Sequence, residues 1–262
     1  MPRHDDTYSV LERKIHKIKT KEYGAVDDED RKTLDEVFDK PALLTIYKLM
    51  KDGLIDTIDF PISTGKEANV FRVTSPDGDF YALKIYRTSN LTFKRIARYI
   101  EGDPRFKGIH GSRRKVIFAW AIKEFRNLQR LREAKIRVPE PIKFNQNMLV
   151  MEFIGTEGTP APMLRDVELE DATKTYKTIV KYIKLAYKKA ELVHGDLSEY
   201  NILMHEGQPV IIDLGQGMVI EHMNSKEFLI RDIENINRYF RSLDVKVVEP
   251  AELMKQIVGV KK

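Results

Sequence analysis

Two short segments of this 262-residue chain carry side chains whose types and spacing suit phosphate chemistry. The stretch His194-Gly195-Asp196-Leu197-Ser198-Glu199-Tyr200-Asn201 places a carboxylate and a carboxamide on one loop, and Asp213 follows the apolar pair Ile211-Ile212. Phosphoryl transfer from ATP needs metal ions, groups that hold them and a residue that orients the acceptor hydroxyl. Carboxylate and amide oxygens are suitable Mg²⁺ ligands. The pattern predicts Asp196 as the catalytic base and Asn201 and Asp213 as metal ligands.

Each of these residues alone is also typical of a structural position. Asp196 and Asn201 would suit a turn, and Asp213 would suit the end of a strand. The joint spacing, Asp-x4-Asn followed by apolar-apolar-Asp-x-Gly, favours the catalytic interpretation.

A lysine in an apolar run forms the second feature. Lys84 lies in Tyr81-Ala82-Leu83-Lys84-Ile85, which matches the strand that presents a lysine to the α- and β-phosphates in kinases. Burying a lysine without a partner is costly, so a carboxylate is expected nearby. Glu124, within the helical run 120–128, is the predicted partner, and Glu133 is the competitor. The alternative is a lysine at a strand end that reaches solvent.

A loop upstream of Lys84 is the candidate phosphate cradle. Ser63-Thr64-Gly65-Lys66-Glu67-Ala68-Asn69-Val70-Phe71 lies between two strand-like runs. It has one glycine and lacks the Gly-x4-Gly-Lys-Ser/Thr pattern of a Walker A loop. Its candidate nucleotide-binding residues are Ser63, Gly65, Lys66 and Glu67.

The run Met151-Glu152-Phe153-Ile154-Gly155 resembles a hinge before a linker at 155–162. Backbone groups of Glu152 and Ile154 are the candidate adenine contacts. An ordinary buried strand that runs into a loop is the alternative.

The order of the predicted elements indicates two lobes. A helix is expected from Pro41 to Gly53, three strands within 54–86, a helix over 112–134 and two short strands after Pro141. A long helix carrying Tyr176, Ile179 and Ile183 follows the linker, and Asn224 with Glu227 resembles a helix cap. The predicted regions are an N-terminal helical extension at 1–53, a sheet-rich lobe with the hinge at 54–155 and a helical lobe at 156–262.

Charge is unevenly distributed along the chain. The stretch from Lys84 to Lys115 has ten basic and two acidic residues, whereas the whole chain has a net charge of +5. Such a segment is a candidate contact for an anionic partner, with a solvated loop as the alternative. Lysines at 174, 177, 181, 184 and 188 fall on one face of the long helix, and a solvated face is the favoured interpretation there.

The chain has no cysteine, no signal-peptide pattern and no long apolar run. These features exclude disulfide and cysteine-metal chemistry. We expect a cytoplasmic protein without a membrane partner.

The strings STGKEANVF, ALKIY, KEFRNL, HGDLSEYNIL and IIDLGQ together closely resemble the RIO family of atypical serine/threonine protein kinases, in the archaeal form of its first subfamily. The similarity runs from about Pro41 to Phe240. The resemblance implies an α+β, bilobal protein-kinase-like fold with a five-stranded N-lobe sheet and a reduced helical C-lobe. Gly195 stands where ordinary protein kinases have arginine, and no Ala-Pro-Glu motif follows Asp213; both departures fit the family.

The resemblance also implies cofactors and partners. ATP with Mg²⁺, or Mn²⁺ in its place, would be bound, with Lys84 on the phosphates and Asp213 as an aspartyl-phosphate acceptor during ATP hydrolysis. Maturation of the small ribosomal subunit and contact with its RNA are the implied setting. Ser112 would be an autophosphorylation site, although a serine that caps the following helix explains it equally well. The protein substrate is not identified.

Three other functions remain open. A small-molecule kinase of the aminoglycoside phosphotransferase type shares the His-Gly-Asp-x4-Asn loop, but the short C-terminal region leaves little room for its substrate pocket. A pseudokinase scaffold would not need Lys84, Asp196, Asn201 and Asp213 to be intact, and all four are present. An assembly factor that uses ATP as a switch would need the same residues as a kinase.

Overall fold

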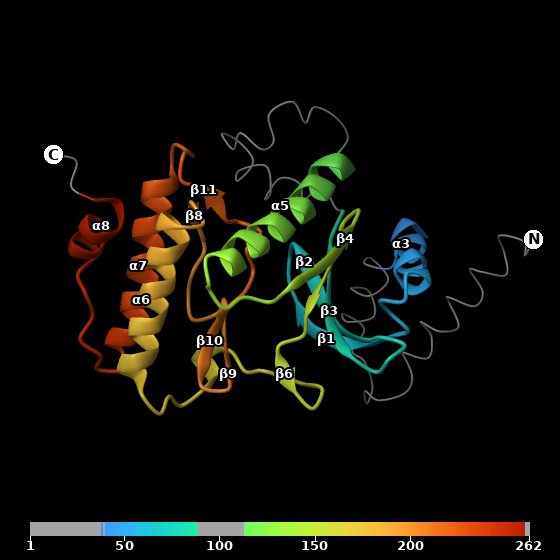
Figure 1. Cartoon of the computed structure of the whole chain (residues 1–262), viewed down its shortest axis with the longest axis horizontal. Helices are drawn as coiled ribbons and strands as arrows, with labels where there is room; N and C mark the ends of the chain where they lie inside the picture. Colours follow the sequence, from blue (N-terminus) through green and yellow to red (C-terminus); the bar gives the residue numbers. More distant parts are fainter. Residues whose placement is uncertain (1–37, 39, 89–112, 260–262) are drawn as a thin grey trace, which may run out of the picture. The chain divides into compact units, whose positions relative to one another are not determined.

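The computed structural model describes residues 38, 40–88 and 113–259 (Figure 1). Ser112, most of the basic segment and most of the N-terminal extension lie outside the described residues. Within them, residue contacts define two compact units. The first contains residues up to 88, 113–121 and 142–153, and the second contains residues 122–141 and 154–259. The region boundaries predicted from the sequence stay predictions.

The first unit is built on an antiparallel sheet in the order β1-β2-β3-β5-β4. Its strands are β1 (Thr57–Thr64), β2 (Ala68–Thr74), β3 (Phe80–Tyr86), β4 (Pro141–Asn145) and β5 (Met148–Glu152). A tight turn joins β2 and β3, in which Gly78 has a φ of 90° and its N–H donates to the Ser75 carbonyl (3.1 Å). The five-stranded sheet expected from the sequence is confirmed.

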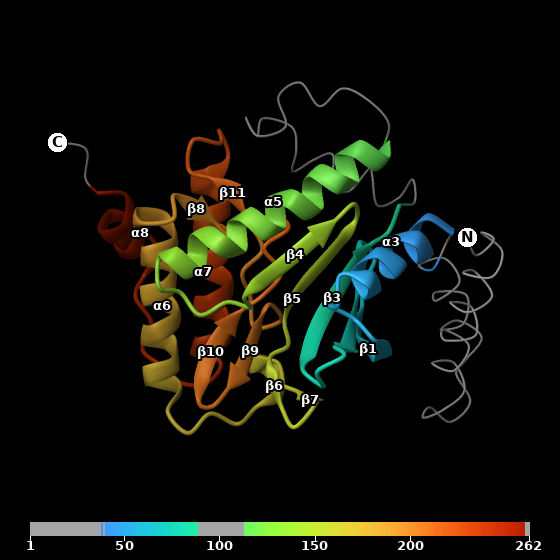
Figure 2. The same cartoon turned by 45° about the vertical axis from the view of Figure 1, so that its right-hand side comes forward.

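Helix α3 (Lys40–Lys51) packs on this sheet, as Figure 2 shows. Its apolar face contributes Ala42, Ile46 and Leu49 to a core shared with Phe71 of β2 and Leu83 of β3. Burial of a large aliphatic side chain contributes roughly 1.5–3 kcal/mol. The sheet that carries Lys84 is therefore stiffened on one face by α3.

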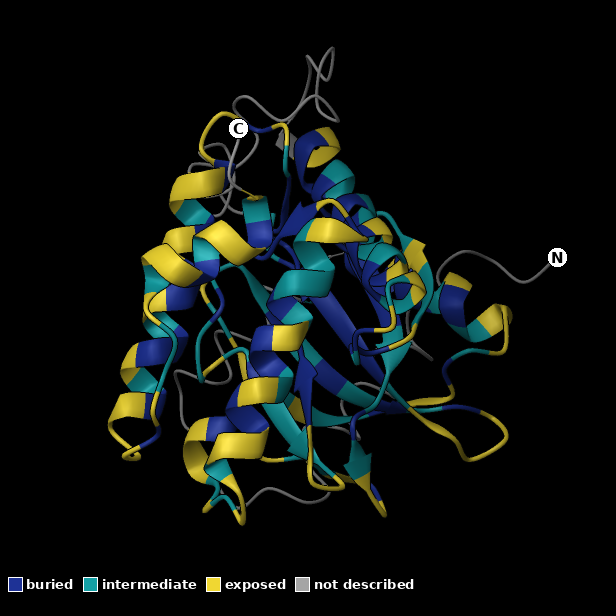
Figure 3. Cartoon of the chain, turned by 60° about the vertical axis from the view of Figure 1, so that its left-hand side comes forward, coloured by how far each residue is buried: buried dark blue, intermediate teal, exposed yellow. Residues whose placement is uncertain are grey.

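The second unit is mainly helical. Its helices include α6 (Ala172–Lys188), α7 (Ser225–Arg241), α8 (Pro250–Val258) and the short 3-10 turn η2 (Leu164–Asp166). Three small antiparallel pairs complete it: β6 (Gly155–Thr156) with β7 (Thr159–Pro160), β8 (Leu192–Val193) with β11 (Met218–Val219), and β9 (Ile202–His205) with β10 (Gln208–Ile211). Buried and exposed stretches alternate along the helices (Figure 3), as amphipathic sequences require.

Helix α5 (Arg113–Glu133) belongs to both units, because the division falls between Ala121 and Ile122. Its helical character and its length agree with the prediction for 112–134. The C-terminal part lies in the second unit and carries Glu124 and Asn127, which are both buried.

Two local predictions need refinement. The expected linker at 155–162 contains the β6–β7 hairpin, which pairs Gly155 with Pro160 and Thr156 with Thr159. Asn224 stands at the N-cap position of α7 as predicted, but its side chain makes no capping bond, because its backbone (φ −97°, ψ 5°) is not in the extended conformation that an N-cap side chain needs.

Candidate active site

Lys84 lies at the centre of the first unit's sheet. Its backbone pairs with Val70 on β2 and with Leu149 on β5. The side chain is buried, and Nζ lies 5.3 Å from the ring centroid of Tyr86, two residues along the same strand. The lysine is therefore not at a solvent-exposed strand end, which removes the structural alternative for this residue.

The loop between β1 and β2 makes a tight turn at Gly65. The Gly65 N–H donates to the Ala68 carbonyl (3.0 Å), and a Cβ at Gly65 would lie 2.9 Å from that same oxygen. Only glycine fits there. The neighbouring Ser63 and Lys66 are exposed, and the Glu67 carbonyl accepts from the Arg87 N–H (2.9 Å), which connects the loop to the end of β3.

The predicted hinge residues fall at the division between the units. Glu152 ends β5, where it pairs with Tyr81, and Ile154 begins the second unit. The Ile154 carbonyl accepts from the Ala161 N–H (2.9 Å). This bond fixes the backbone just after the chain passes from the first unit to the second.

In the second unit, Asp196 and Asn201 lie on one hydrogen-bonded loop. The Asn201 Nδ2 donates to the Asp196 carbonyl (2.8 Å), and the Asn201 N–H donates to the Ser198 carbonyl (3.0 Å). Because Nδ2 is held by the loop itself, Oδ1 is the side-chain atom left to meet a ligand. This arrangement orients the amide as a metal ligand requires.

Asp213 has an unusual backbone conformation. Its φ is 60°, in the left-handed region that an L-residue other than asparagine or aspartate rarely adopts, and its side chain is exposed. The Ile212 N–H just before it donates to the Asn201 carbonyl (3.0 Å), so Asp213 directly follows a backbone bond to the Asp196–Asn201 loop.

Helix α5 fixes the turn after Asp213. Glu124 Oε1 accepts from the Leu214 N–H (3.1 Å), and Asn127 Nδ2 donates to the carbonyls of Leu214 (2.9 Å) and Gly217 (3.0 Å). A Cβ at Gly217 would lie 2.9 Å from Asn127 Nδ2. Glu124 thus positions the Asp213 turn, and its predicted pairing with Lys84 stays a prediction. Asn127 was not predicted as a site residue.

Helix α7 holds the Asp196 loop by its backbone. The buried Asp232 carboxylate accepts from the N–H groups of Gly195 and Leu197, each at 2.8 Å. Arg231 donates to the Gly195 carbonyl, and Asn235 Nδ2 donates to the Leu197 carbonyl (3.2 Å). All four backbone groups of the residues flanking Asp196 are therefore held from one helix.

Sequence reasoning missed these three α7 residues, although a signal existed for one of them. Asp232 falls on the apolar face that carries Leu229, Ile233 and Ile236, where a carboxylate is out of place. A buried acid without a partner is costly, so its position predicts hydrogen bonds of the kind observed.

Gly195 is required by geometry. Its φ is +81°, and a Cβ would lie 3.2 Å from both the Gln216 carbonyl oxygen and Met218 Cε. An arginine here would be strained by its backbone and would crowd the chain after Asp213. The structure therefore gives a steric reason for glycine at the position before Asp196.

The electrostatics distinguish Asp196 from an ordinary surface acid. Burial raises the pKa of the Asp196 carboxyl above its usual 3.8, and the nearby Asp213 carboxylate acts in the same direction. His194, Arg231 and the hydrogen bond with Asn201 oppose that rise in pKa. A carboxylate with a raised pKa accepts a proton more readily, as a base near a hydroxyl acceptor should.

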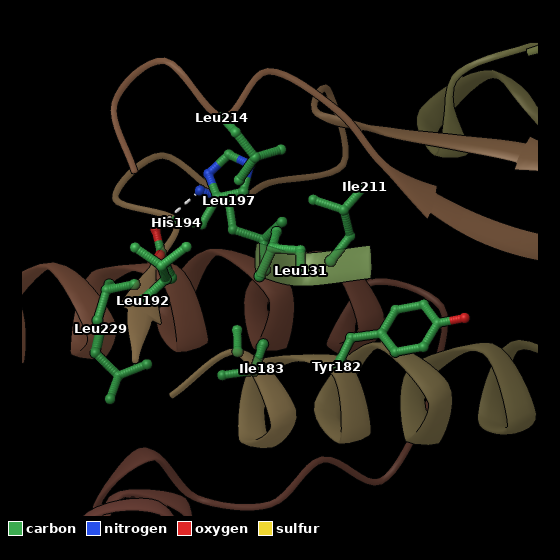
Figure 4. Close-up of a pocket in the computed structure, with 12 residues that line it drawn as sticks. Leu131, Tyr182, Ile183, Leu192, His194, Leu197, Ile211, Leu214 and Leu229 are labelled. Carbon is green, nitrogen blue, oxygen red and sulfur yellow. Dashed lines mark hydrogen bonds between the residues drawn. The ribbon is translucent and has the colours of Figure 1, made fainter. Parts of the chain in front are cut away.

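His194 is a structural residue of the loop. Its Nδ1 accepts from the Asp196 N–H (3.3 Å), and its Nε2 lies 3.0 Å from the Ile212 carbonyl, which can only accept. The ring borders a cavity of about 20 Å³ with Leu131, Ile183 and Leu192 among its lining (Figure 4). Such a cavity holds about one water molecule, so it is not a nucleotide site.

The donor set fits a magnesium ion. Mg²⁺ commonly binds through one or two protein oxygens, with water and phosphate completing its shell. Asn201 Oδ1 and the Asp213 carboxylate are such oxygens. Among the described residues, no group of three or more histidine, aspartate, glutamate or cysteine side chains forms an all-protein metal site, and magnesium at a nucleotide does not need one.

Comparison with known proteins was consistent across sequence and structure. Residues 69–253 match the sequence model of a family described as the RIO domain. The chain is 44% identical over 215 residues to the RIO-type serine/threonine-protein kinase Rio1 of Haloferax volcanii, covering 82% of this chain and 74% of that protein. It is 40% identical over 256 residues to the human serine/threonine-protein kinase RIO1, covering 95% of this chain and 45% of that protein. The chain thus spans about half the length of its human relative.

The fold is also similar to a solved structure. A crystal structure of the Rio2 kinase–ADP/Mg²⁺–phosphoaspartate complex from Chaetomium thermophilum matches with a TM-score of 0.64 at 25% identity, covering 84% of this chain and 66% of that one. The predicted α+β, protein-kinase-like fold is confirmed. Among the described residues, no helix combines the length and apolar character needed to cross a membrane.

The buried Asp232 carboxylate should make stability depend on pH. Burial raises its pKa from 3.8 to about 6, against the opposing effects of His194, Arg231 and its two N–H donors. Between pH 3.8 and about 6 the folded chain therefore keeps a proton on Asp232 that the unfolded chain has released. The bound proton contributes to the free energy of unfolding at low pH, and this contribution is lost as pH rises through about 6.

Asp232→Asn removes that titration. The unfolding free energy of the wild type minus that of the variant, from urea denaturation, should fall by about 2 kcal/mol between pH 4.5 and 7.5. A difference that does not change with pH would contradict the assignment.

Gly195→Ala should destabilise the chain by more than its backbone conformation alone explains. Gly207→Ala is the matched control, because its φ is +69° but no atom lies within 4 Å of an added Cβ. Both variants should lose about 1–2 kcal/mol from the left-handed backbone, and Gly195→Ala should lose more through its contacts with Gln216 and Met218. Equal losses in thermal unfolding would show that the close approach is unimportant.

Proposed function

This chain belongs to the RIO family of serine/threonine-protein kinases, and on that premise we propose that it transfers the γ-phosphate of ATP to a serine hydroxyl. Asp196 is the base that orients and deprotonates the acceptor. The observation that carries the proposal is the loop on which the Asn201 amide is bonded to the Asp196 backbone at 2.8 Å. One rigid loop then presents both the base and a metal ligand.

The other residues have distinct proposed roles. Lys84 contacts the α- and β-phosphates and pairs with Glu124, and the turn at Gly65 covers the phosphates with Ser63, Lys66 and Glu67. Backbone groups of Glu152 and Ile154 bind adenine. Lys84 is buried and lies in an apolar strand, and both observations support its proposed role.

Asn201 and Asp213 would hold Mg²⁺. When bound, the ion neutralises charge on the phosphates and holds them in line with the acceptor. The protein's part is to fix the two oxygens. The bond from the Asn201 side chain to the Asp196 carbonyl supports this, as do the bonds of Glu124 and Asn127 with the backbone of Leu214. Mn²⁺ is a second metal to compare in the assay.

An ATPase switch is the second candidate, and one observation favours it. The similar Rio2 kinase was solved with ADP, Mg²⁺ and phosphoaspartate. In this chain Asp213 offers an exposed carboxylate on a backbone in the left-handed conformation. Its oxygen would attack the γ-phosphorus, ADP would leave, and water would later release phosphate from the acyl phosphate. The slow rate of hydrolysis would then determine when a conformational change occurs.

The cellular setting is a further proposal. By family similarity we propose that the chain acts on small ribosomal subunit precursors in the cytoplasm, contacts their RNA and phosphorylates itself at Ser112. The net positive charge of +8 over 84–115 supports the RNA contact. Mass spectrometry after incubation with ATP should find phosphate on Ser112. An unmodified Ser112 would contradict the proposed autophosphorylation.

Variants of the two aspartates should separate base from metal ligand. Asp196→Asn should bind MgATP in calorimetry within about threefold of the wild type but transfer phosphate about 10²–10⁴-fold more slowly, because it lacks the base. Asp213→Asn should lose metal-dependent nucleotide binding. Normal transfer by Asp196→Asn would refute the assigned base.

The pH dependence of transfer tests the raised pKa of Asp196. The base must be ionised, so the rate should fall as pH drops through a pKa above 3.8. An acid limb at or below 3.8 would contradict the effect of burial.

Product analysis separates the candidate functions. With γ-labelled ATP, a kinase labels protein, whereas a switch releases phosphate that increases when small-subunit precursors are added. Labelling of aminoglycosides or small alcohols instead would favour the small-molecule kinase.

A further inference from the structure

Helix α6 carries a charge pattern that opposes its own stability. Its 17 residues contain five lysines and no acid, and its first turn has no acidic residue. Lys174 lies in that first turn, where the positive end of the helix dipole disfavours a cation. Lysines three or four residues apart repel one another by roughly 0.2–0.5 kcal/mol per pair.

Helix α7 has the same length and a mixed pattern. Its first turn holds Glu227 beside Lys226, and Arg238 and Arg241 lie in its last turn, where the helix dipole favours cations. The lysine row is therefore a property of α6 and not of the helices of this unit in general.

The lysines form a straight row on the face opposite the core. The buried residues of α6 include Tyr176, Ile179 and Ile183, whereas Lys174, Lys177, Lys181 and Lys188 are exposed. At 1.5 Å per residue the stretch from Lys174 to Lys188 is about 21 Å long, and it holds five lysines when Lys184 is included. Lys184 within it donates to Gln256 of α8 (2.8 Å).

Among the described residues, no ion pair joins the exposed lysines of this row to an acid. The N-terminal half also borders a shallow hollow of about 430 Å³, lined by Asp171, Thr173, Lys174, Lys177, Thr178 and Lys181. Asp171 accepts from the Lys174 N–H (2.8 Å) as the helix cap. The hollow is thus lined by three lysines and two threonines beside the single Asp171 carboxylate, and this excess of cations suits an anion-rich ligand.

We propose that the lysine row of α6 (Lys174, Lys177, Lys181 and Lys188) binds the phosphodiester backbone of a nucleic acid, without reading its sequence. Ammonium groups along one helix face act as point charges for phosphates. A membrane surface fits less well, because insertion needs apolar side chains beside the cations. The exposed large apolar residues of the described chain include none on α6. The row consists of other residues than the basic segment 84–115, and its proposed role does not depend on the kinase activity.

The test uses the full chain and fluorescence anisotropy with labelled 20-nucleotide single-stranded and duplex RNA. Lys174→Gln/Lys177→Gln/Lys181→Gln should weaken both complexes about tenfold or more. It should also reduce the slope of log K against log salt by about 2–3, because each phosphate contact contributes about 0.7–0.9. Lys135→Gln/Lys226→Gln/Lys246→Gln is the control, since it removes the same charge from exposed sites outside α6.

A second variant separates binding from folding. Lys174→Glu places an acid three residues after the Asp171 cap and in the first turn, so it should raise the thermal midpoint while weakening RNA binding. ATP turnover should be unchanged in all these variants, so failure here is distinguishable from failure of the proposed kinase.

Three results would overturn the proposal. One is equal loss of affinity in the α6 and control triple variants. Another is unchanged RNA binding by the α6 variants. The third is α6-dependent binding to phosphatidylserine vesicles or an acidic peptide but not to RNA.

Discussion

The buried Asp232 carboxylate is the interaction on which the loop of Asp196 depends. It joins α7 to the N–H groups of Gly195 and Leu197, more than thirty positions earlier in the chain. Burial penalises its charge and raises its pKa to about 6, yet removing it would leave two N–H donors without an acceptor. The precision of the loop thus comes from a helix whose apolar face is packed in the core, as a site on a loop requires.

The turn after Asp213 follows the same principle with a different helix. Glu124 and Asn127 of α5 bind the backbone of Leu214 and Gly217. In both places a buried polar side chain fixes backbone atoms, while the residue assigned to the chemistry stays accessible. Gly195 and Gly217 permit these segments to pack closely, since a Cβ at either position would crowd atoms of neighbouring segments. Asp196, Asn201 and Asp213 therefore need not hold themselves in place.

The features that could be predicted from the sequence are those that local residue patterns determine. The three N-lobe strands, α5 and the Asp196–Asn201 loop were predicted because apolar periodicity and turn residues are local signals. Asp232 and Asn127 were missed, because periodicity shows which helix face is buried but not which distant backbone group will meet it. Asn224 stands at the predicted helix start, but its side-chain bond is absent because the backbone conformation there does not suit one. The Lys84–Glu124 pair and the nucleotide contacts of Gly65, Glu152 and Ile154 stay predictions.

Convergence on one nucleotide is best tested by a crystal structure of the chain with Mg²⁺ and a non-hydrolysable ATP analogue. We expect Asn201 Oδ1 and an Asp213 carboxylate oxygen at about 2.1 Å from the metal, with Lys84 Nζ in contact with the α- and β-phosphates. A nucleotide bound away from Lys84, or a metal held by residues other than Asn201 and Asp213, would contradict the proposed active site.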